Sequence, residues 1–128
     1  MNVFLTGASS GIGAALAAEF ARRGATLGLV ARRPDALDAV LAQVPGRHHR
    51  YAVDVTDKDA LIAAARDFDD ATGGADVVIA NAGISIGVLS EYYADLDAFG
   101  DVFRTNVLAT AYTFHPFIGR MRARGRGT

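Results

Sequence analysis

The sequence predicts a doubly wound α/β fold with a parallel sheet, and three observations support this prediction. Four apolar runs have the length of strands, at residues 3–5, 27–31, 51–53 and 77–80. They are continuous rather than alternating, as expected for strands that are covered on both faces. Segments with apolar residues at helical spacing lie between them, and a repeated strand–helix–strand order implies right-handed crossovers within one sheet.

Each of the first three predicted helices has an apolar stripe and an end signal. Gly24, residues 45–46 and residues 73–74 supply glycine or proline where these helices should end. Thr56 and Asp59 have the spacing of a capping box at the start of the third helix. The stripes consist of Ile12, Leu16 and Phe20, of Leu37, Val40, Leu41 and Val44, and of Leu61, Ala65 and Phe68.

A longer fourth helix is predicted near residues 95–123, after a loop at residues 81–94. Ordinary packing on the sheet accounts for part of its apolar stripe. The stripe is wider than one sheet face requires, so a partner helix is a further expectation. Pro116 should bend the helix or remove one hydrogen bond without necessarily ending it. The stripe consists of Phe99, Val102, Phe103, Val107, Ala111, Phe114, Phe117, Ile118 and Met121.

The composition describes one compact domain over residues 1–128, with 51% hydrophobic residues and a net charge of −1. This balance gives no global basic field for nucleic acid or an anionic membrane. The absence of cysteine excludes disulfides and thiolate metal sites and fits a reducing compartment. No apolar run approaches the ~20 residues that span a bilayer, and a first strand at residues 2–5 leaves no room for a signal peptide. We therefore expect a cytoplasmic domain without a metal site.

A glycine-rich turn, Thr6-Gly7-Ala8-Ser9-Ser10-Gly11-Ile12-Gly13, joins the first strand to the first helix. The unpaired N–H groups and the positive dipole end of a helix start stabilise an anion, typically a phosphate. Glycine is needed where the chain turns tightly or where a Cβ would block a ligand. The spacing differs from the G-x-G-x-x-G of most dinucleotide sites, and a purely structural turn is the alternative. The candidate binding residues are Gly7, Ser9, Ser10, Gly11, Ile12 and Gly13.

Four motifs in order along the chain make the sequence resemble the short-chain dehydrogenase/reductase family. The glycine turn matches that family's TGxxxGxG motif. Asp54 follows the third strand, Asn81-Ala82-Gly83 follows the fourth, and Asn106 lies in the long helix. The resemblance covers all 128 residues but only the first half of the family's domain. It implies a Rossmann-like sheet with four strands in this chain, in the order 3-2-1-4.

The end of the second strand bears on the choice of cofactor. In dinucleotide folds an acidic residue there binds the ribose of NAD, whereas an arginine accommodates the 2′-phosphate of NADP. This sequence has Arg32 and Arg33 at that place and no carboxylate before Asp35. A guanidinium pairs well with a dianionic phosphate, so we expect NADP(H), with Arg32 as the main contact and Arg33 adding positive field. The alternative is a pair of solvated arginines in a loop.

The resemblance also implies roles for residues after the third and fourth strands. Asp54 would accept a hydrogen bond from the adenine amino group, with Val55 against the ring. Asp54 can equally cap the next helix, in competition with Thr56. The segment Asn81-Ala82-Gly83 would lie along the nicotinamide ribose, and the Asn81 amide can also bridge neighbouring strands.

Asn106 lies among apolar residues of the long helix and, when buried, needs a fixed hydrogen-bond partner. One interpretation is a polar residue that bends the helix and bonds to a neighbouring loop. The resemblance implies instead membership of a Ser–Tyr–Lys–Asn group, in which the asparagine distorts the helix and holds a water in a proton relay. Asn106 is therefore the catalytic candidate of this chain.

The remaining members of that catalytic group are absent from this sequence. Neither Tyr92 nor Tyr93 is followed by lysine four residues later, and Lys58 is the only lysine. These tyrosines are expected to pack, and the arginine-rich run at residues 120–126 is expected to be a solvated helix end. The fourth strand would leave an unpaired sheet edge. We therefore expect a longer parent polypeptide, and weak cofactor binding, self-association and no turnover from the chain as given.

The leading hypothesis is the cofactor-binding half of an NADP(H)-dependent oxidoreductase that interconverts an alcohol and a carbonyl by hydride transfer. The alternative is a non-catalytic NADP(H)-binding sensor or interaction module. A methyltransferase-like nucleoside binder leaves Arg32, Arg33 and residues 81–83 unexplained. By resemblance, the helix at residues 95–123 would form much of a homo-oligomer interface, and the substrate loop lies downstream of these residues.

Overall fold

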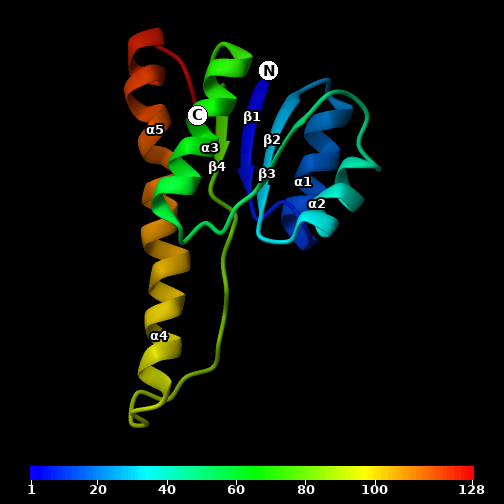
Figure 1. The fold of residues 1–128 in the computed structure, drawn as a ribbon. Coiled ribbons are helices and arrows are strands. Elements are labelled where there is room, and N and C mark those ends of the chain that lie inside the picture. Colours follow the sequence, from blue (N-terminus) through cyan, green and yellow to red (C-terminus); the bar gives the residue numbers. More distant parts are fainter.

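The computed structural model describes residues 1–128 as alternating strands and helices (Figure 1). The strands form one parallel sheet in the order β3-β2-β1-β4, which confirms the predicted fold class and strand order. The strands are β1 (Asn2–Thr6), β2 (Thr26–Ala31), β3 (His49–Ala52) and β4 (Val77–Ile79). The helices are α1 (Gly11–Arg22), α2 (Pro34–Leu41), α3 (Lys58–Thr72), α4 (Asp95–Phe103), the π-helical segment η1 (Arg104–Leu108) and α5 (Ala109–Arg124).

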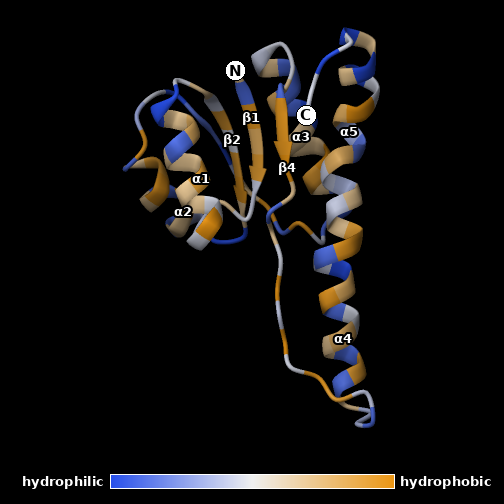
Figure 2. Cartoon of the chain, turned by 180° about the vertical axis from the view of Figure 1, so that it is seen from behind, coloured by the Kyte–Doolittle hydropathy of each residue, from blue (hydrophilic) through white to orange (hydrophobic).

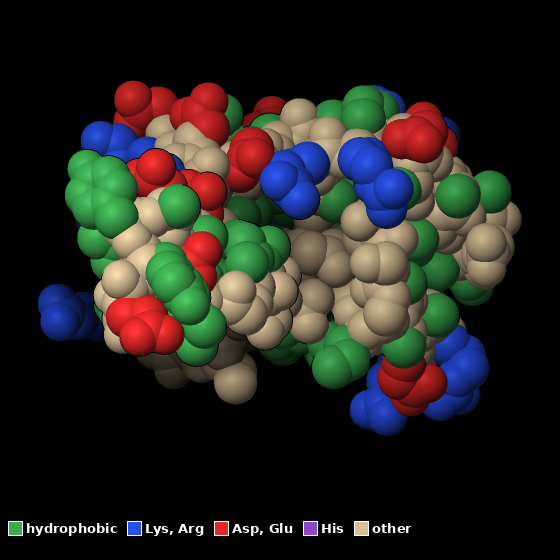
Figure 3. Space-filling model, turned by 90° about the horizontal axis from the view of Figure 1, so that it is seen from below, with side chains coloured by type: hydrophobic (Ala, Val, Ile, Leu, Met, Phe, Trp, Pro, Cys, Tyr) green, Lys and Arg blue, Asp and Glu red, His purple; other side chains and the backbone are tan.

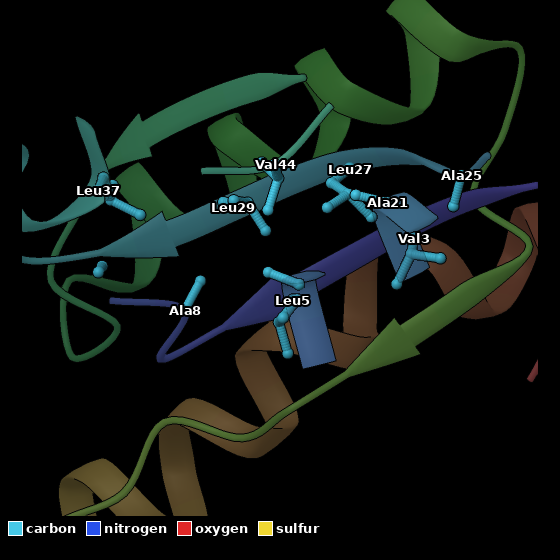
Figure 4. Packing of buried hydrophobic residues seen from close by; sticks show 11 residues of the cluster. Val3, Leu5, Ala8, Ala21, Ala25, Leu27, Leu29, Leu37 and Val44 are labelled. Carbon is cyan, nitrogen blue, oxygen red and sulfur yellow. The ribbon is translucent and has the colours of Figure 1, made fainter. Parts of the chain in front are cut away.

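Helices cover both faces of the sheet, with α1 and α2 on one face and α3 and α5 on the other (Figure 1). Successive residues of β1 point to opposite faces. Val3 and Leu5 join the core under α1 and α2, shown in Figure 4, whereas Phe4 joins the core under α3 and α5. There Phe4 packs against Phe68 and Phe117, with ring centroids 5.6 and 5.1 Å apart. Burial of both faces explains the continuous apolar character of the strands.

The deepest-buried face of α1 is made of small residues, and the stripe predicted from Ile12, Leu16 and Phe20 is wrong at Ile12, whereas Leu16 and Phe20 pack against the core. Ile12 is 74% exposed, and the other two are only partly buried. The buried residues of this helix are Gly13, Ala17 and Ala21. They let α1 approach so closely that a Cβ on Gly13 would overlap the carbonyl oxygen of Gly7.

Two helix ends also differ from the sequence-based expectation. Asp57 caps α3, because its Oδ1 accepts the Ala60 N–H at 3.1 Å. Thr56 lies outside the helix and donates its N–H and its hydroxyl to Asp54 Oδ1, at 2.9 and 2.8 Å, so the expected capping box does not form. The second helix ends three residues before Val44, which still packs in the core.

The long helix forms as α4, η1 and α5 in direct succession and continues through Pro116. Its second half packs on α3 and the sheet, and its buried residues are Ala109, Thr113 and Phe117. No residue of α4 is buried, and this helix and the loop before it extend beyond the carboxyl ends of the strands (Figures 1 and 2). Much of the predicted stripe is therefore exposed; the exposed fractions lie between 36% and 58% for Phe99, Phe103, Val107, Phe114 and Ile118.

A buried carboxylate fastens the end of α5 to the end of α3. Asp69 is 3% exposed; its Oδ1 accepts the Ala75 N–H at 2.6 Å and its Oδ2 accepts from Arg120 Nη1 at 2.9 Å. Arg124 Nη1 lies 3.8 Å from the same Oδ2, and Arg124 Nη2 donates to the Ala75 carbonyl at 2.7 Å. Arg120 also pairs with Asp70. These two arginines anchor the helix, so the expectation of a fully solvated run is wrong for them.

The final residue lies beside β4. The Thr128 N–H donates to the Asp76 carbonyl at 2.9 Å, and the Thr128 carbonyl accepts the Val78 N–H at 2.8 Å. The outer edge of β4 is therefore partly paired, and the expectation of an unpaired edge is wrong at this point. None of the helices has the length and apolarity that crossing a bilayer requires.

Replacing Asp69 with asparagine should lower the free energy of unfolding by about 2 kcal/mol. The change keeps an oxygen for the Ala75 N–H but removes the charge that faces Arg120 and Arg124. Breaking a buried ion pair from one side costs about 3–5 kcal/mol, and the partial exposure of both arginines reduces this figure. Urea unfolding measures the change. Asp70→Asn, at a carboxylate that is 65% exposed, is the control and should change stability by less than about 0.5 kcal/mol. Equal effects would contradict the assignment.

Gly13→Ala should destabilise the chain by at least about 2 kcal/mol, because the added methyl group overlaps backbone atoms that cannot move independently. Gly119→Ala provides the matched control within α5. An added Cβ there meets no atom within 4 Å, and alanine should stabilise that helix by about 0.5–1 kcal/mol. Denaturant unfolding of both variants measures the difference, and a Gly13→Ala chain of wild-type stability would refute the close approach of α1.

Candidate functional site

A pocket with a volume of about 930 Å³ lies at the carboxyl ends of the strands. Figure 3 looks onto these ends and shows a hollow lined mainly by backbone and small polar side chains, with basic groups on its rim. The lining consists of Gly7, Ser9, Ser10, Ile12, Ala31, Arg32, Arg33, Val53, Asp54, Val55, Thr56, Asn81, Ala82, Gly83, Ile84, Asp101, Arg104 and Thr105. Every cofactor-binding candidate from the sequence is in this lining except Gly11 and Gly13.

The start of α1 faces this pocket with its N–H groups uncapped. Ser10 is the N-cap residue, with φ −162° and ψ 169°, and its side chain makes no capping hydrogen bond. The first turn carries no acidic residue. Gly11 has φ +52°, and a Cβ there would meet no atom within 4 Å, so open space lies beside the helix start. This arrangement is suited to an anion held by backbone donors.

A hydrogen-bonded link between β1 and the end of β4 shapes the floor of the pocket. The buried Thr6 hydroxyl accepts the N–H groups of Asn81 and Ala82, at 3.1 and 3.2 Å. The Asn81 amide donates to the carbonyls of Thr6 and Gly7, both at 3.2 Å. A Cβ on Gly7, which has φ +68°, would lie 2.8 Å from Ala82 Cα. Thr6 and the Asn81 amide therefore bridge strands, and the Thr6 hydroxyl is directed away from the pocket lining.

The basic side of the pocket follows β2. Arg32 and Arg33 are both exposed there, and Arg32 Nη1 lies 3.9 Å from Asp54 Oδ2. The other oxygen of Asp54 is occupied by Thr56. Arg33 has no carboxylate within ion-pair distance, so it is the arginine of this pair whose charge is not offset by a neighbour. Val55 lies beside them, buried in the core and lining the pocket.

Asn106 clamps Ile84, a residue of the loop that follows β4. Its Oδ1 accepts the Ile84 N–H and its Nδ2 donates to the Ile84 carbonyl, both at 2.9 Å. The side chain is exposed, and the expected fixed partner is present. Asn106 lies within η1, where the helix is π-helical, and its carbonyl accepts the Thr110 hydroxyl at 2.9 Å. Asn106 does not line the pocket itself, but its neighbour Thr105 does.

Another part of the pocket wall comes from residues 101–105 of the long helix, which the sequence interpretation did not assign to the site. Asp101 and Arg104 form an ion pair at 2.8 Å and line the pocket with Thr105. Their spacing, three and four residues apart, places them on one side of the helix. That spacing does not by itself show which side of the helix faces the pocket, so the sequence held no direct signal for these residues.

The loop between β4 and α4 leaves its aromatic side chains in solvent. Tyr92 is 56% exposed and Tyr93 is 90% exposed, so the expectation that they pack is wrong. The Asp95 carboxylate accepts the Leu89 N–H at 2.8 Å and ties this loop to the start of α4.

Comparison with known proteins gives the same family along the whole chain. Residues 1–128 match the family model described as short chain dehydrogenase. A fatty acyl-CoA reductase of Mycobacterium tuberculosis is 42% identical over 111 residues, which cover 84% of this chain and 37% of that protein. A sulfoacetaldehyde reductase of Chromohalobacter salexigens is 32% identical over 127 residues, which cover 98% of this chain and 50% of that protein. The chain thus spans half or less of the length of these relatives.

Solved structures agree with this result. A metagenomic short-chain oxidoreductase in complex with NADP has a TM-score of 0.88 and 32% identity, over 99% of this chain and 58% of that one. The L-sorbose reductase of Gluconobacter frateurii, complexed with NADPH and L-sorbose, has a TM-score of 0.86 and 32% identity, over 98% of this chain and 49% of that one. Both the sequence and the fold of this chain match these relatives from the glycine turn to the end of the long helix. The chain therefore belongs to the short-chain dehydrogenase/reductase family.

Proposed function

We propose that these residues form the NADP(H)-binding half of an oxidoreductase that interconverts an alcohol and a carbonyl by hydride transfer. One observation carries the proposal: a single pocket is lined both by an uncapped helix start and by the pair Arg32 and Arg33. The end of β2 carries no acidic residue that would repel a phosphate there. The helix start suits a pyrophosphate and the arginines suit a 2′-phosphate. Family membership supports the reaction class.

The residues present fit such a cofactor. Open space beside Gly11 and the unbonded Ser10 side chain leave room and donors for the pyrophosphate. Arg32 and Arg33 would hold the 2′-phosphate, and Asp54 with Val55 would hold the adenine. Asn81-Ala82-Gly83 would lie along the nicotinamide ribose. The bound cofactor would supply or accept the hydride, and the groups of this chain would bind and orient it.

Asn106 acts in this proposal as a positioning residue. Both ends of its amide are occupied by Ile84, so it holds the backbone beside Gly83 rather than reaching the substrate. These 128 residues hold no candidate for the group that would exchange a proton with the carbonyl oxygen, and we expect no carbonyl reduction from them alone. Cofactor binding is therefore the property to measure.

We also propose that the protein assembles as a homo-oligomer through the exposed side of the long helix. Its half-exposed phenylalanine, valine and isoleucine side chains form a larger apolar surface than a monomer commonly leaves in water.

Arg32→Asp should reverse the preference for NADPH over NADH. Loss of a charge-assisted contact, with repulsion added, should weaken NADPH binding about 10- to 100-fold and leave NADH binding within about threefold. Titration of nicotinamide fluorescence with the 128-residue chain measures both affinities. The control Arg47→Asp makes the same charge change at an exposed residue outside the pocket and should leave the ratio unchanged. An unchanged ratio in Arg32→Asp would refute the 2′-phosphate assignment.

Asn106→Ala should accelerate hydrogen exchange of the Ile84 amide about five- to tenfold, because the amide loses its acceptor. NMR or mass spectrometry of exchange measures the effect. Thr110→Val is the matched control: it removes the hydroxyl bonded to the Asn106 carbonyl but leaves the Ile84 clamp in place. Equal acceleration in both variants would mean that the clamp does not hold this loop.

A further inference from the structure

Arg104 lines the pocket but has no role in the proposed function. Its guanidinium lies back along the helix, where Nη1 donates to Asp101 Oδ1 at 2.8 Å. A Cβ on Gly100 would lie 3.6 Å from Arg104 Nη2, so the glycine leaves room for the group. Because the N–H groups of a guanidinium lie in its plane, Asp101 holds Arg104 by an edge. The side chain is 62% exposed, and a flat face of it therefore remains available for stacking.

Arg104 and the residues proposed to hold the adenine lie on the same face of the sheet. Asp54 and Val55 follow β3 and lead into α3, whereas Arg104 lies in η1, which continues into α5. Helices α3 and α5 pack together on one face, and the glycine turn leads into α1 on the other (Figure 1). The pocket therefore extends from the start of α1 to a group of residues that includes both Val55 and Arg104.

The geometry of the helix separates Arg104 from the nicotinamide end of the pocket. Successive helical residues are about 100° apart around the axis. Asp101, Arg104 and Thr105 therefore share one side of the helix, and all three line the pocket. Asn106 is on nearly the opposite side from Arg104 and is bonded to Ile84, just after the segment proposed to lie along the nicotinamide ribose. Arg104 is thus directed toward the other end of the cofactor, where the adenine would lie.

The pocket lining contains no aromatic side chain on which a purine could stack. Val55, which is buried in the core, offers an apolar surface to one face of the ring. The planar Asn81 amide is held between strands, and Arg32 and Arg33 are assigned to the 2′-phosphate. Guanidinium groups stack on aromatic rings and on the π-face of a base. Arg104 is therefore the group of this lining best suited to cover the second face of the adenine.

We propose that Arg104 stacks on the adenine of the bound dinucleotide, with the ring between its guanidinium and Val55, and that Asp101 positions the guanidinium for this contact. The inference rests on the proposed function, because it concerns the same cofactor. It adds a contact that does not involve the 2′-phosphate. The contact should therefore strengthen the binding of NADH and NADPH alike, in contrast to that of Arg32.

Titration of nicotinamide fluorescence in the 128-residue chain tests the inference. Arg104→Ala should weaken NADPH and NADH binding to the same extent, by about three- to tenfold, because both cofactors carry the same adenine. Reduced nicotinamide mononucleotide lacks the adenosine and should bind the wild-type chain and the variant within about twofold of one another. Arg122→Ala is the matched control: it removes an exposed arginine of α5 outside the pocket and should change none of these affinities.

Arg104→Lys separates the planar group from its charge. Lysine keeps the positive charge but has no flat face, so it should recover at most about twofold of the lost affinity. NMR observes the contact directly. In a chain with isotope-labelled arginine, the adenine H2 and H8 protons of bound NADPH should show nuclear Overhauser effects to an arginine side chain. These effects should disappear in Arg104→Lys and persist in Arg122→Ala.

Several results would overturn the inference. A loss of affinity confined to NADPH would make Arg104 a phosphate contact, and full recovery in Arg104→Lys would mean that charge alone matters. A comparable loss for the mononucleotide would assign Arg104 to the nicotinamide end. Wild-type affinities in Arg104→Ala refute this inference alone, whereas a wild-type chain that binds neither dinucleotide refutes the proposed function as well.

Discussion

The close approach of α1 to the end of β1 is the constraint on which the pocket depends. Gly13 packs on the Gly7 carbonyl so tightly that no side chain fits, and the amide of Asn81, just after β4, donates to that same carbonyl. The end of β1, the start of α1 and the residue Asn81, which is distant in sequence, therefore meet at one atom. Beside this contact the turn at Ser10 and Gly11 is open, because a Cβ on Gly11 would meet no atom within 4 Å and the Ser10 side chain makes no capping hydrogen bond. The glycines of the turn thus serve two purposes: Gly7 and Gly13 permit packing, and Gly11 leaves space.

The long helix has two different environments, and the π-helical segment separates them. Beyond η1 the helix is anchored, since Phe117 is buried against the sheet and Arg120 reaches the buried Asp69. Before η1 the helix has no buried residue. Asn106 stands at the boundary and ties the helix to Ile84. The anchored half, α5, therefore fixes the axis of the helix. The other half, α4, is held at the pocket only by its continuity with that axis and by the Asn106–Ile84 hydrogen bonds.

The fold could be predicted from the sequence because both faces of the sheet are buried. Each strand is therefore a continuous apolar run in the sequence. The pocket could be predicted where a motif marks a strand end, as at Arg32 and Asn81. Three features could not. Ile12 continues a helical stripe, yet the close packing at Gly13 turns it outward. Thr56 has the spacing of a capping residue, but its N–H and its hydroxyl both donate to Asp54 instead. Asp101 and Arg104 carry no motif, and their place in the pocket follows from the direction of a helix, which periodicity alone does not encode.

Relative magnitudes decide how the charges of the pocket would respond to a phosphate. Arg32 faces Asp54 at 3.9 Å between two exposed side chains, and such a pair contributes about 0–1 kcal/mol. A charge-assisted hydrogen bond to phosphate contributes about 1.5–3 kcal/mol, so a dianion would displace the pair rather than be excluded by it. Asp54 would not be left without partners, because its other oxygen already accepts two hydrogen bonds from Thr56. The ion pair with Asp54 therefore holds Arg32 beside the pocket. It is weak enough for a bound phosphate to replace it.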